Sequence, residues 1–163
     1  MRSSKYWIDK LNLVSHPEGG YFKEVYRSDE SMKADSLPSR FLGDRSFSTA
    51  IYFLLEKDQK SAFHRIKSDE LWHFYDGDPV IIYIIDQKGS LSTLKLGLNF
   101  NKGYSPQIVI PANCWFAAET EGNFTLSGCT VAPGFNFDDF ELAARNKLSE
   151  EFPQHKVLIN KFT

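Results

Sequence analysis

Apolar residues are spaced differently at the two ends of the chain than in its middle. Over residues 4–14 they recur three and four positions apart, which predicts an amphipathic helix with Ser3 or Ser4 as its N-cap. Pro17 follows and limits how far this helix extends. A helical spacing returns only over residues 137–148, where we expect a second helix.

Between these ends, alternating and β-branched segments predict about nine strands. Turn residues separate them, at positions 76–79, 86–89 and 121–123. The predicted strands span residues 21–27, 46–55, 61–66, 70–75, 80–85, 91–96, 107–110, 114–118 and 124–131. Short strands with a helix at each end favour an all-β class with flanking helices, built as an antiparallel sandwich or barrel.

The strand predicted at residues 80–85 is apolar on both of its faces. A strand buried on one face only would alternate with polar residues, so a second element must cover the outer face. The terminal helices and a second subunit are both suitable covers. We favour the subunit, which predicts a homodimer.

Charge and composition exclude several function classes. The chain has 163 residues, with 19 Lys and Arg against 21 Asp and Glu, for a formal net charge of −2. This balance argues against a nucleic-acid partner and against a polybasic membrane anchor. The longest apolar run is too short to span a bilayer, and no signal peptide is recognisable, so we expect a cytoplasmic protein. Cys114 and Cys129 lie in apolar strands, and we interpret them as reduced core thiols.

The segment 58–77 holds the clearest candidate chemistry. His64 falls on the same strand face as Ala62 and Ile66, and Glu70 on the same face as Trp72. If the apolar members face the interior, His64 and Glu70 are neighbouring buried polar groups that pair directly or through water or a ligand. A His beside a carboxylate is suited to general base catalysis, so both are candidate catalytic residues. A purely structural pair is the alternative.

The spacing of His64, Glu70 and Gly77 resembles the first motif of the cupin superfamily, although Ile66 stands where that motif has its second His. A weaker second motif surrounds Pro111, with Phe116 at the position of the metal-binding His. Longer segments match more closely, in the order HPEGGYFKEVYRS, STAIYFLL, SAFHRIKSDELWHFYDGDP, VIPANCWFAA and GCTVAPGF. Together they resemble the cupin-5 family, also called DUF985, over nearly the whole chain.

This resemblance implies a single cupin domain over residues 1–163, with a double-stranded β-helix (jelly roll) barrel, and a homodimer. Metal cupins use three His and one Glu. Here Ile66 and Phe116 occupy two of those four positions, so we expect no metal and no other cofactor. His73 does not replace them, because it lies three residues from Glu70 and faces the opposite side of its strand.

Metal-free cupins that epimerise nucleotide sugars are similar to this arrangement, with a barrel His as base and a Tyr as acid. We therefore expect a small-molecule ligand of the sugar or nucleotide-sugar type, with His64 as the base of an epimerase or isomerase. A non-enzymatic binding module with the same cavity is the alternative, and a metal-dependent enzyme is a third. Strand register does not decide between Tyr26, Tyr52 and Tyr83 as the acid.

The turn at Gly19 and Gly20 brings further polar groups together, and we expect it at the mouth of the barrel. Arg27 and Lys23 are suited to receive phosphate or carboxylate there, and Glu18 to receive hydroxyl groups. The candidate ligand-binding residues are Glu18, Tyr21, Tyr26, Arg27, Tyr52, Trp72, Tyr83, Trp115 and Phe116.

Overall fold

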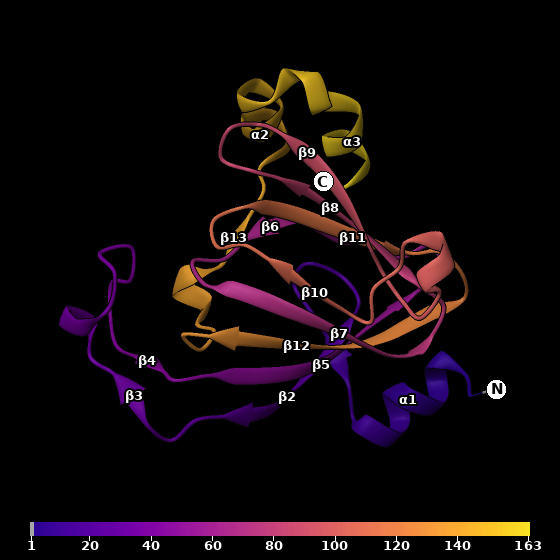
Figure 1. Ribbon diagram of the computed structural model, residues 1–163, viewed down its shortest axis with the longest axis horizontal. Coiled ribbons are helices and arrows are strands. Elements are labelled where there is room, and N and C mark those ends of the chain that lie inside the picture. The colour runs from indigo at the N-terminus through magenta and orange to yellow at the C-terminus, as the bar shows by residue number, and fades with distance from the viewer. Residues whose placement is uncertain (1) are drawn as a thin grey trace.

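The computed structural model describes residues 2–163 and consists mainly of two antiparallel sheets that pack face to face (Figure 1). The six-stranded sheet has the order β1 (Val14–Ser15), β2 (Tyr21–Arg27), β5 (Thr49–Glu56), β12 (Phe124–Ala132), β7 (Asp69–Gly77) and β10 (Gln107–Ile110). The five-stranded sheet has the order β13 (Glu141–Leu142), β6 (Ser61–Arg65), β11 (Trp115–Thr120), β8 (Val80–Ile85) and β9 (Leu91–Leu96). A short arm pairs β3 (Ser31–Met32) with β4 (Arg45–Ser46).

The main core lies between the two sheets. Phe53, Trp72 and Cys129 enter it from the six-stranded sheet, and Ile82 and Phe116 from the five-stranded one. These residues alternate along their strands with outward-facing ones, as a strand buried on one face requires. Both cysteines are buried and free, so the prediction of reduced core thiols is confirmed.

The first helix, α1 (Ser4–Leu11), packs on the outer face of the six-stranded sheet (Figure 1). Ser3 caps it by accepting a hydrogen bond from the Tyr6 backbone N–H. It ends before the predicted position 14, because Asn12 adopts a left-handed conformation with φ 52° and donates its N–H to the Ile8 carbonyl.

The helix predicted over residues 137–148 is wrong for most of its length. Residues Phe137–Asp139 form a single 3-10 turn capped by Asn136, and Glu141–Leu142 form the edge strand β13 against β6. The helix α2 (Arg145–Glu151) begins later, and a 3-10 turn (Pro153–His155) connects it to α3 (Lys156–Lys161). The Asp139 carboxylate explains the break, since it is buried and receives two hydrogen bonds from Arg45, at 2.6 and 2.7 Å.

The C-terminal helices cover the outer face of β8 around Tyr83 and Ile85. Ile85 and Tyr83 on that face pack with Leu148 of α2 and with Ile159 and Phe162 at α3. Figure 1 shows α2 and α3 above the five-stranded sheet. The alternative cover, the terminal helices, therefore accounts for the apolar residues of this part of the strand, and the homodimer stays a prediction.

Two further 3-10 turns, Ala34–Ser36 and Phe100–Lys102, lie in connecting segments. Within residues 2–163, no helix has the length and apolar character that crossing a membrane requires.

Candidate functional site

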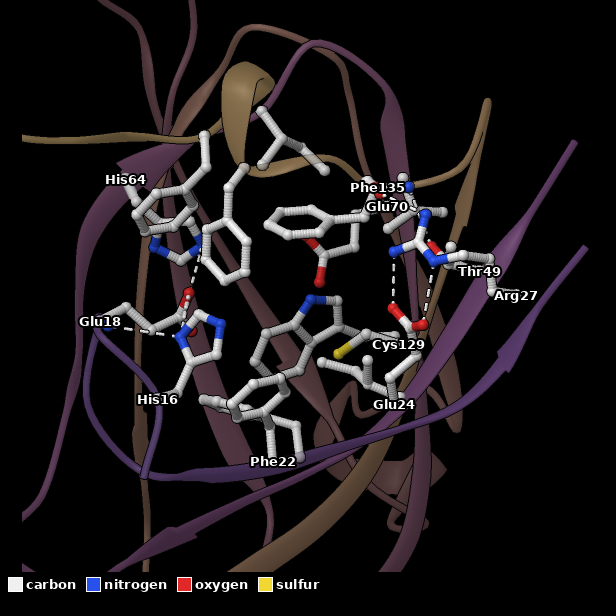
Figure 2. Close-up of a pocket in the computed structure, with 17 residues that line it drawn as sticks. His16, Glu18, Phe22, Glu24, Arg27, Thr49, His64, Glu70, Cys129 and Phe135 are labelled. Carbon is white, nitrogen blue, oxygen red and sulfur yellow. Dashed lines mark hydrogen bonds and ion pairs between the residues drawn. The ribbon is translucent and has the colours of Figure 1, made fainter. Parts of the chain in front are cut away.

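A cavity of about 80 Å³ opens at one end of the space between the two sheets. Its floor and walls come mainly from the inner face of the six-stranded sheet. His64 of β6 and Ile66, the residue that follows β6, line it from the other sheet. Figure 2 shows the labelled side chains converging on this space. The lining residues are His16, Glu18, Phe22, Glu24, Arg27, Thr49, Ile51, Phe53, His64, Ile66, Glu70, Trp72, Cys129, Val131, Phe135, Phe137 and Phe140.

The turn before β2 brings Glu18 to the deep end of the cavity. Gly19 and Gly20 have φ values of 110° and 73°, which only glycine adopts readily. A Cβ atom on Gly20 would lie 2.7 Å from the Leu54 carbonyl oxygen. The turn is held against β6, where the Ala62 N–H donates to the Glu18 carbonyl oxygen at 2.8 Å. The Gly-Gly pair therefore places the Glu18 side chain beside His64.

Glu18 and His64 form a pair that holds one proton between them. The Nδ1 of His64 lies 2.8 Å from the Ala62 carbonyl, which can only accept, so Nδ1 carries a hydrogen. The other ring nitrogen, Nε2, lies 3.0 Å from the Glu18 Oε2. Because neutral His64 has no hydrogen left for Nε2, a hydrogen bond there needs one additional proton, on either Glu18 or His64.

Burial decides where that proton resides. Only 2% of His64 and 8% of Glu18 are exposed. Burial lowers the pKa of His64 to about 3, because the charged imidazolium loses its hydration. Burial and the nearby Glu70 charge raise the pKa of Glu18 well above its ordinary value, although the hydrogen bond from Ser61 Oγ at 2.7 Å acts in the opposite direction. We assign the neutral pair, with the proton on Glu18 and donated to His64.

His16 completes this end of the cavity. Its Nδ1 accepts the Glu18 backbone N–H at 3.3 Å and also lies 3.3 Å from Glu18 Oε2, the oxygen that faces His64. Burial lowers the pKa of His16 to about 4. The ring is held edge-on by Phe22, with centroids 4.5 Å apart, and stacks near Phe137 at 6.4 Å.

Glu70 enters the cavity from the opposite wall. In Figure 2 its carboxyl group points into the space between the Glu18–His64 pair and Arg27. Burial raises its pKa to about 7, and its polar neighbours Cys129 and Trp72 moderate that rise. Glu70 is paired in register with Val131 within the six-stranded sheet, whereas His64 belongs to the other sheet. The two residues therefore face one cavity from different walls, and the carboxyl bonded to His64 is that of Glu18.

A charged pair lies at the mouth. Arg27 donates to both carboxylate oxygens of Glu24, at 3.0 and 2.7 Å, and to the Phe135 carbonyl at 3.0 Å (Figure 2). Its charge is thus compensated by a carboxylate of this chain, which lowers the attraction for an anionic ligand. The register of β2 against β5 shifts between Glu24 and Tyr26, which turns Arg27 to the same side as Glu24.

The structure brings five of the predicted site residues to the cavity, namely Glu18, Arg27, His64, Glu70 and Trp72. The other six lie elsewhere. Tyr26 is 52% exposed as a result of the register shift, and Tyr21 and Tyr52 pack on the outer face near α1. Phe116 lies in the core, with its ring centroid 4.0 Å from that of His64.

The remaining two residues, Tyr83 and Trp115, lie under the C-terminal helices. Tyr83 donates its hydroxyl to Glu119 at 2.9 Å, and burial raises its pKa to about 12. The Arg65 guanidinium lies over the Trp115 ring, 4.4 Å from its centroid. None of the three candidate acids, Tyr26, Tyr52 and Tyr83, is among the residues that line the cavity.

The donor set does not fit the metal centre of a metal-binding cupin. Ile66 lines the cavity and Phe116 packs against His64, so hydrocarbon occupies two of the four ligand positions. His73 faces away and pairs with Thr130 Oγ1 at 3.1 Å. In the part of the chain that the structure describes, no three His, Cys, Asp or Glu side chains are grouped to hold a metal ion.

Sequence reasoning gave no site role to several residues that the structure places here. His16 and Glu24 received no role of their own, Cys129 was interpreted as a core thiol, and Phe137 and Phe140 were assigned to a helix. The HPEGG turn was the signal for His16, since a buried histidine two residues before Glu18 is positioned to contact its backbone. No local signal indicates the phenylalanines, because they close the cavity from the far end of the chain.

A protein-family model described as "Cupin superfamily (DUF985)" matches residues 5–143 of this chain. An uncharacterised protein of Saccharomyces cerevisiae is 31% identical over 147 residues, covering 81% of this chain and 71% of that protein. Two solved structures are similar with a TM-score of 0.90. A Shewanella oneidensis protein is 38% identical, with 100% of this chain and 98% of that chain covered. A hypothetical protein from Leishmania major is 29% identical, with 99% of each chain covered.

Oxalate decarboxylase from Bacillus subtilis is a more distant structural neighbour. It has a TM-score of 0.57 and 13% identity over 91% of this chain and 36% of that chain. At this identity the likeness shows the fold alone. These matches confirm the predicted jelly-roll cupin fold, here as two facing sheets.

Proposed function

This chain belongs to the DUF985 family of the cupin superfamily, and we propose that its cavity binds a small hydroxylated carbonyl compound of the sugar type and moves a proton on it without a metal. The Glu18–His64 pair is the group that transfers the proton. Glu70, on the opposite wall, is the second carboxyl in reach of a bound ligand. The reaction class is that of an epimerase or isomerase.

The 3.0 Å approach of Glu18 Oε2 to His64 Nε2, with His64 Nδ1 bonded to the Ala62 carbonyl, carries this proposal. A pair that shares one proton can release it to a ligand from one member and recover it on the other. A buried group that donates and accepts protons beside a ligand cavity is suited to general acid–base catalysis. The Ser61 hydroxyl and the Ala62 carbonyl hold the two side chains in place, so the geometry is preorganised.

The size and charge of the cavity restrict the ligand. A cavity that holds benzene measures about 150 Å³, so about 80 Å³ suits a ligand, or one end of a ligand, with only a few non-hydrogen atoms. A nucleotide sugar would keep its nucleotide outside the mouth. Arg27 is the one Lys or Arg among the lining residues, which all belong to the described part of the chain, and Glu24 already compensates its charge. The cavity therefore favours neutral groups over anions.

Deuterium exchange tests the proposal. The protein is incubated in D2O with a panel of small ketoses, aldoses and nucleotide sugars, and proton NMR follows the loss of signal at carbons next to the carbonyl group. We expect exchange on at least one member with the wild type and loss of at least 100-fold in rate with His64→Gln and with Glu18→Gln. His73→Gln is the matched control, since His73 lies outside the cavity. Equal exchange rates in His64→Gln and the wild type would refute the proposal.

A non-enzymatic binding module is the second candidate, and one observation favours it. A His64 with a pKa of about 3 is a weak base at neutral pH. Rapid proton transfer therefore needs a ligand that raises this pKa when it binds. If panel members raise the melting temperature of the protein but none exchanges a proton, the cavity recognises its ligand without turnover.

A further inference from the structure

Two buried polar groups on β7 are left for a ligand after the Glu18–His64 pair is accounted for. Trp72 is only 1% exposed, and its indole Nε1 has no hydrogen-bond partner in the structure of residues 2–163. Glu70 is two residues away on the same face of the strand, and the residue is 8% exposed. Both residues line the cavity.

The indole of Trp72 and the carboxyl of Glu70 are close neighbours on β7. Trp72 is close enough to favour the ionised form of Glu70, but Nε1 does not meet the geometry of a hydrogen bond. An indole N–H can only donate, and a buried donor without a partner is uncommon in folded proteins. One ligand oxygen atom in contact with both groups would satisfy both.

We propose that Trp72 and Glu70 form a subsite for one hydroxyl group of the ligand. The hydroxyl oxygen accepts from the Trp72 N–H, and the hydroxyl hydrogen is donated to the Glu70 carboxyl. This inference rests on the proposed function, in that the ligand is the small sugar-like molecule that the cavity binds. It adds that a hydroxyl group is the part of the ligand that Trp72 and Glu70 recognise.

A hydroxyl group fits this subsite better than the other oxygen groups of small metabolites. A ligand carboxylate or phosphate would meet the ionised form of Glu70 without a free cation to offset the repulsion, because Glu24 already compensates Arg27. A carbonyl oxygen only accepts, so it would suit Trp72 but would need Glu70 to be protonated. Since burial raises the pKa of Glu70 to about 7, both forms are present at neutral pH, and a hydroxyl bonds to either.

The chain contains a matched control for Trp72. Trp115 is also buried, at 6% exposure, and its Nε1 also lacks a partner among the described residues. It lies under the C-terminal helices and does not line the cavity. A ligand that uses the subsite should therefore affect Trp72 and leave Trp115 unchanged.

The experiment uses the three indole N–H signals of the ¹⁵N-labelled protein, from Trp7, Trp72 and Trp115. The variants Trp7→Phe and Trp115→Phe assign these signals while leaving Trp72 intact, so the key measurement does not require a Trp72 variant to fold. The probes are acetone, hydroxyacetone and dihydroxyacetone, which share one carbonyl skeleton and carry zero, one and two hydroxyl groups. Each probe is titrated into the full chain.

We expect hydroxyacetone and dihydroxyacetone to shift the Trp72 signal in a saturable way, and acetone to leave it in place. Trp72→Phe should weaken the binding of hydroxyacetone about tenfold, the loss expected for one hydrogen bond, while Trp115→Phe should not change it. A shift of Trp72 by acetone equal to that by hydroxyacetone would indicate a carbonyl subsite and overturn the inference. So would the absence of a Trp72 shift with all three probes.

The subsite and the proposed function can be refuted independently of each other. His64→Gln should abolish deuterium exchange and preserve the Trp72 shift by hydroxyacetone. A Trp72 shift in a protein that exchanges no proton would keep the subsite and remove the proton-transfer proposal. Exchange on a sugar, without a Trp72 shift by the hydroxylated probes, would keep the proposed function and remove the subsite.

Discussion

Replacing Glu70 by Gln should make the protein more stable than the wild type at alkaline pH. The substitution removes a buried carboxyl group whose ionisation is unfavourable in the folded state. The folded protein raises the pKa of Glu70 from its ordinary value of 4.5 to about 7. Each pKa unit corresponds to about 1.4 kcal/mol, so ionisation of Glu70 costs the folded state about 3 kcal/mol. That is a substantial part of the 5–15 kcal/mol typical of a folded domain.

The sign follows from proton binding. Between pH 4.5 and about 7 the folded chain holds a proton on Glu70 that the unfolded chain has lost. The contribution of Glu70 to stability is therefore fully present below pH 4.5 and is lost as the pH rises through 7. Glu70→Gln keeps the shape of the side chain and does not ionise, so this loss should disappear.

Urea unfolding at pH 4.5, 6, 7 and 8 measures the effect. The free energy of unfolding of the variant relative to the wild type should rise by about 3 kcal/mol from pH 4.5 to pH 8. Glu150→Gln, at an exposed position on α2, should show no such change. A difference between Glu70→Gln and wild type that stays constant over this pH range would refute the assignment of a raised pKa to Glu70.

Four further predictions follow from the same contacts. Phe162→Ala should lower the free energy of unfolding by about 3–5 kcal/mol in urea titrations, since this ring is fully buried between α3 and the five-stranded sheet. Arg45→Met should cost about 3–5 kcal/mol in the same assay by leaving the buried Asp139 carboxylate with only Lys67 at 3.3 Å, and a loss below 1 kcal/mol would contradict this. Gly20→Ala should destabilise the protein by about 1–3 kcal/mol, because alanine is strained at φ 73° and its Cβ would meet the Leu54 carbonyl. The homodimer implied by the family resemblance stays a prediction, and light scattering should give twice the chain mass of 18.7 kDa.

Strand positions were the most predictable part of this fold. The predicted ranges agree with β2 (Tyr21–Arg27), β8 (Val80–Ile85), β9 (Leu91–Leu96) and β10 (Gln107–Ile110) at both ends. Each of these strands is bounded by turn residues, so local sequence determines where it stops. The C-terminal segment was misread because aromatic residues that close the cavity happen to follow a helical spacing. Their positions depend on the buried Arg45–Asp139 pair, which joins distant parts of the chain.

The candidate site was predictable only within one hairpin. His64, Glu70 and Trp72 were found because alternation along β6 and β7 puts them on inward faces. The partner of His64 was missed, since Glu18 reaches it through a turn fixed by the long-range hydrogen bond from Ala62. Tyr26 was placed in the site by alternation, but a shift in register between β2 and β5 turns it outward. Such a shift depends on strand pairing, which no local pattern specifies.

The state of the His64 ring tests the central claim most directly. Two-dimensional ¹H–¹⁵N NMR of the imidazole groups reports which ring nitrogen carries hydrogen and at what pH the ring becomes charged. We predict that His64 is neutral, with hydrogen on Nδ1, from pH 8 down to about pH 4, because the Ala62 carbonyl selects this tautomer and burial lowers its pKa to about 3. A His64 ring that titrates near its ordinary pKa of 6.5, or that carries its hydrogen on Nε2 when neutral, would contradict a proton held between Glu18 and His64.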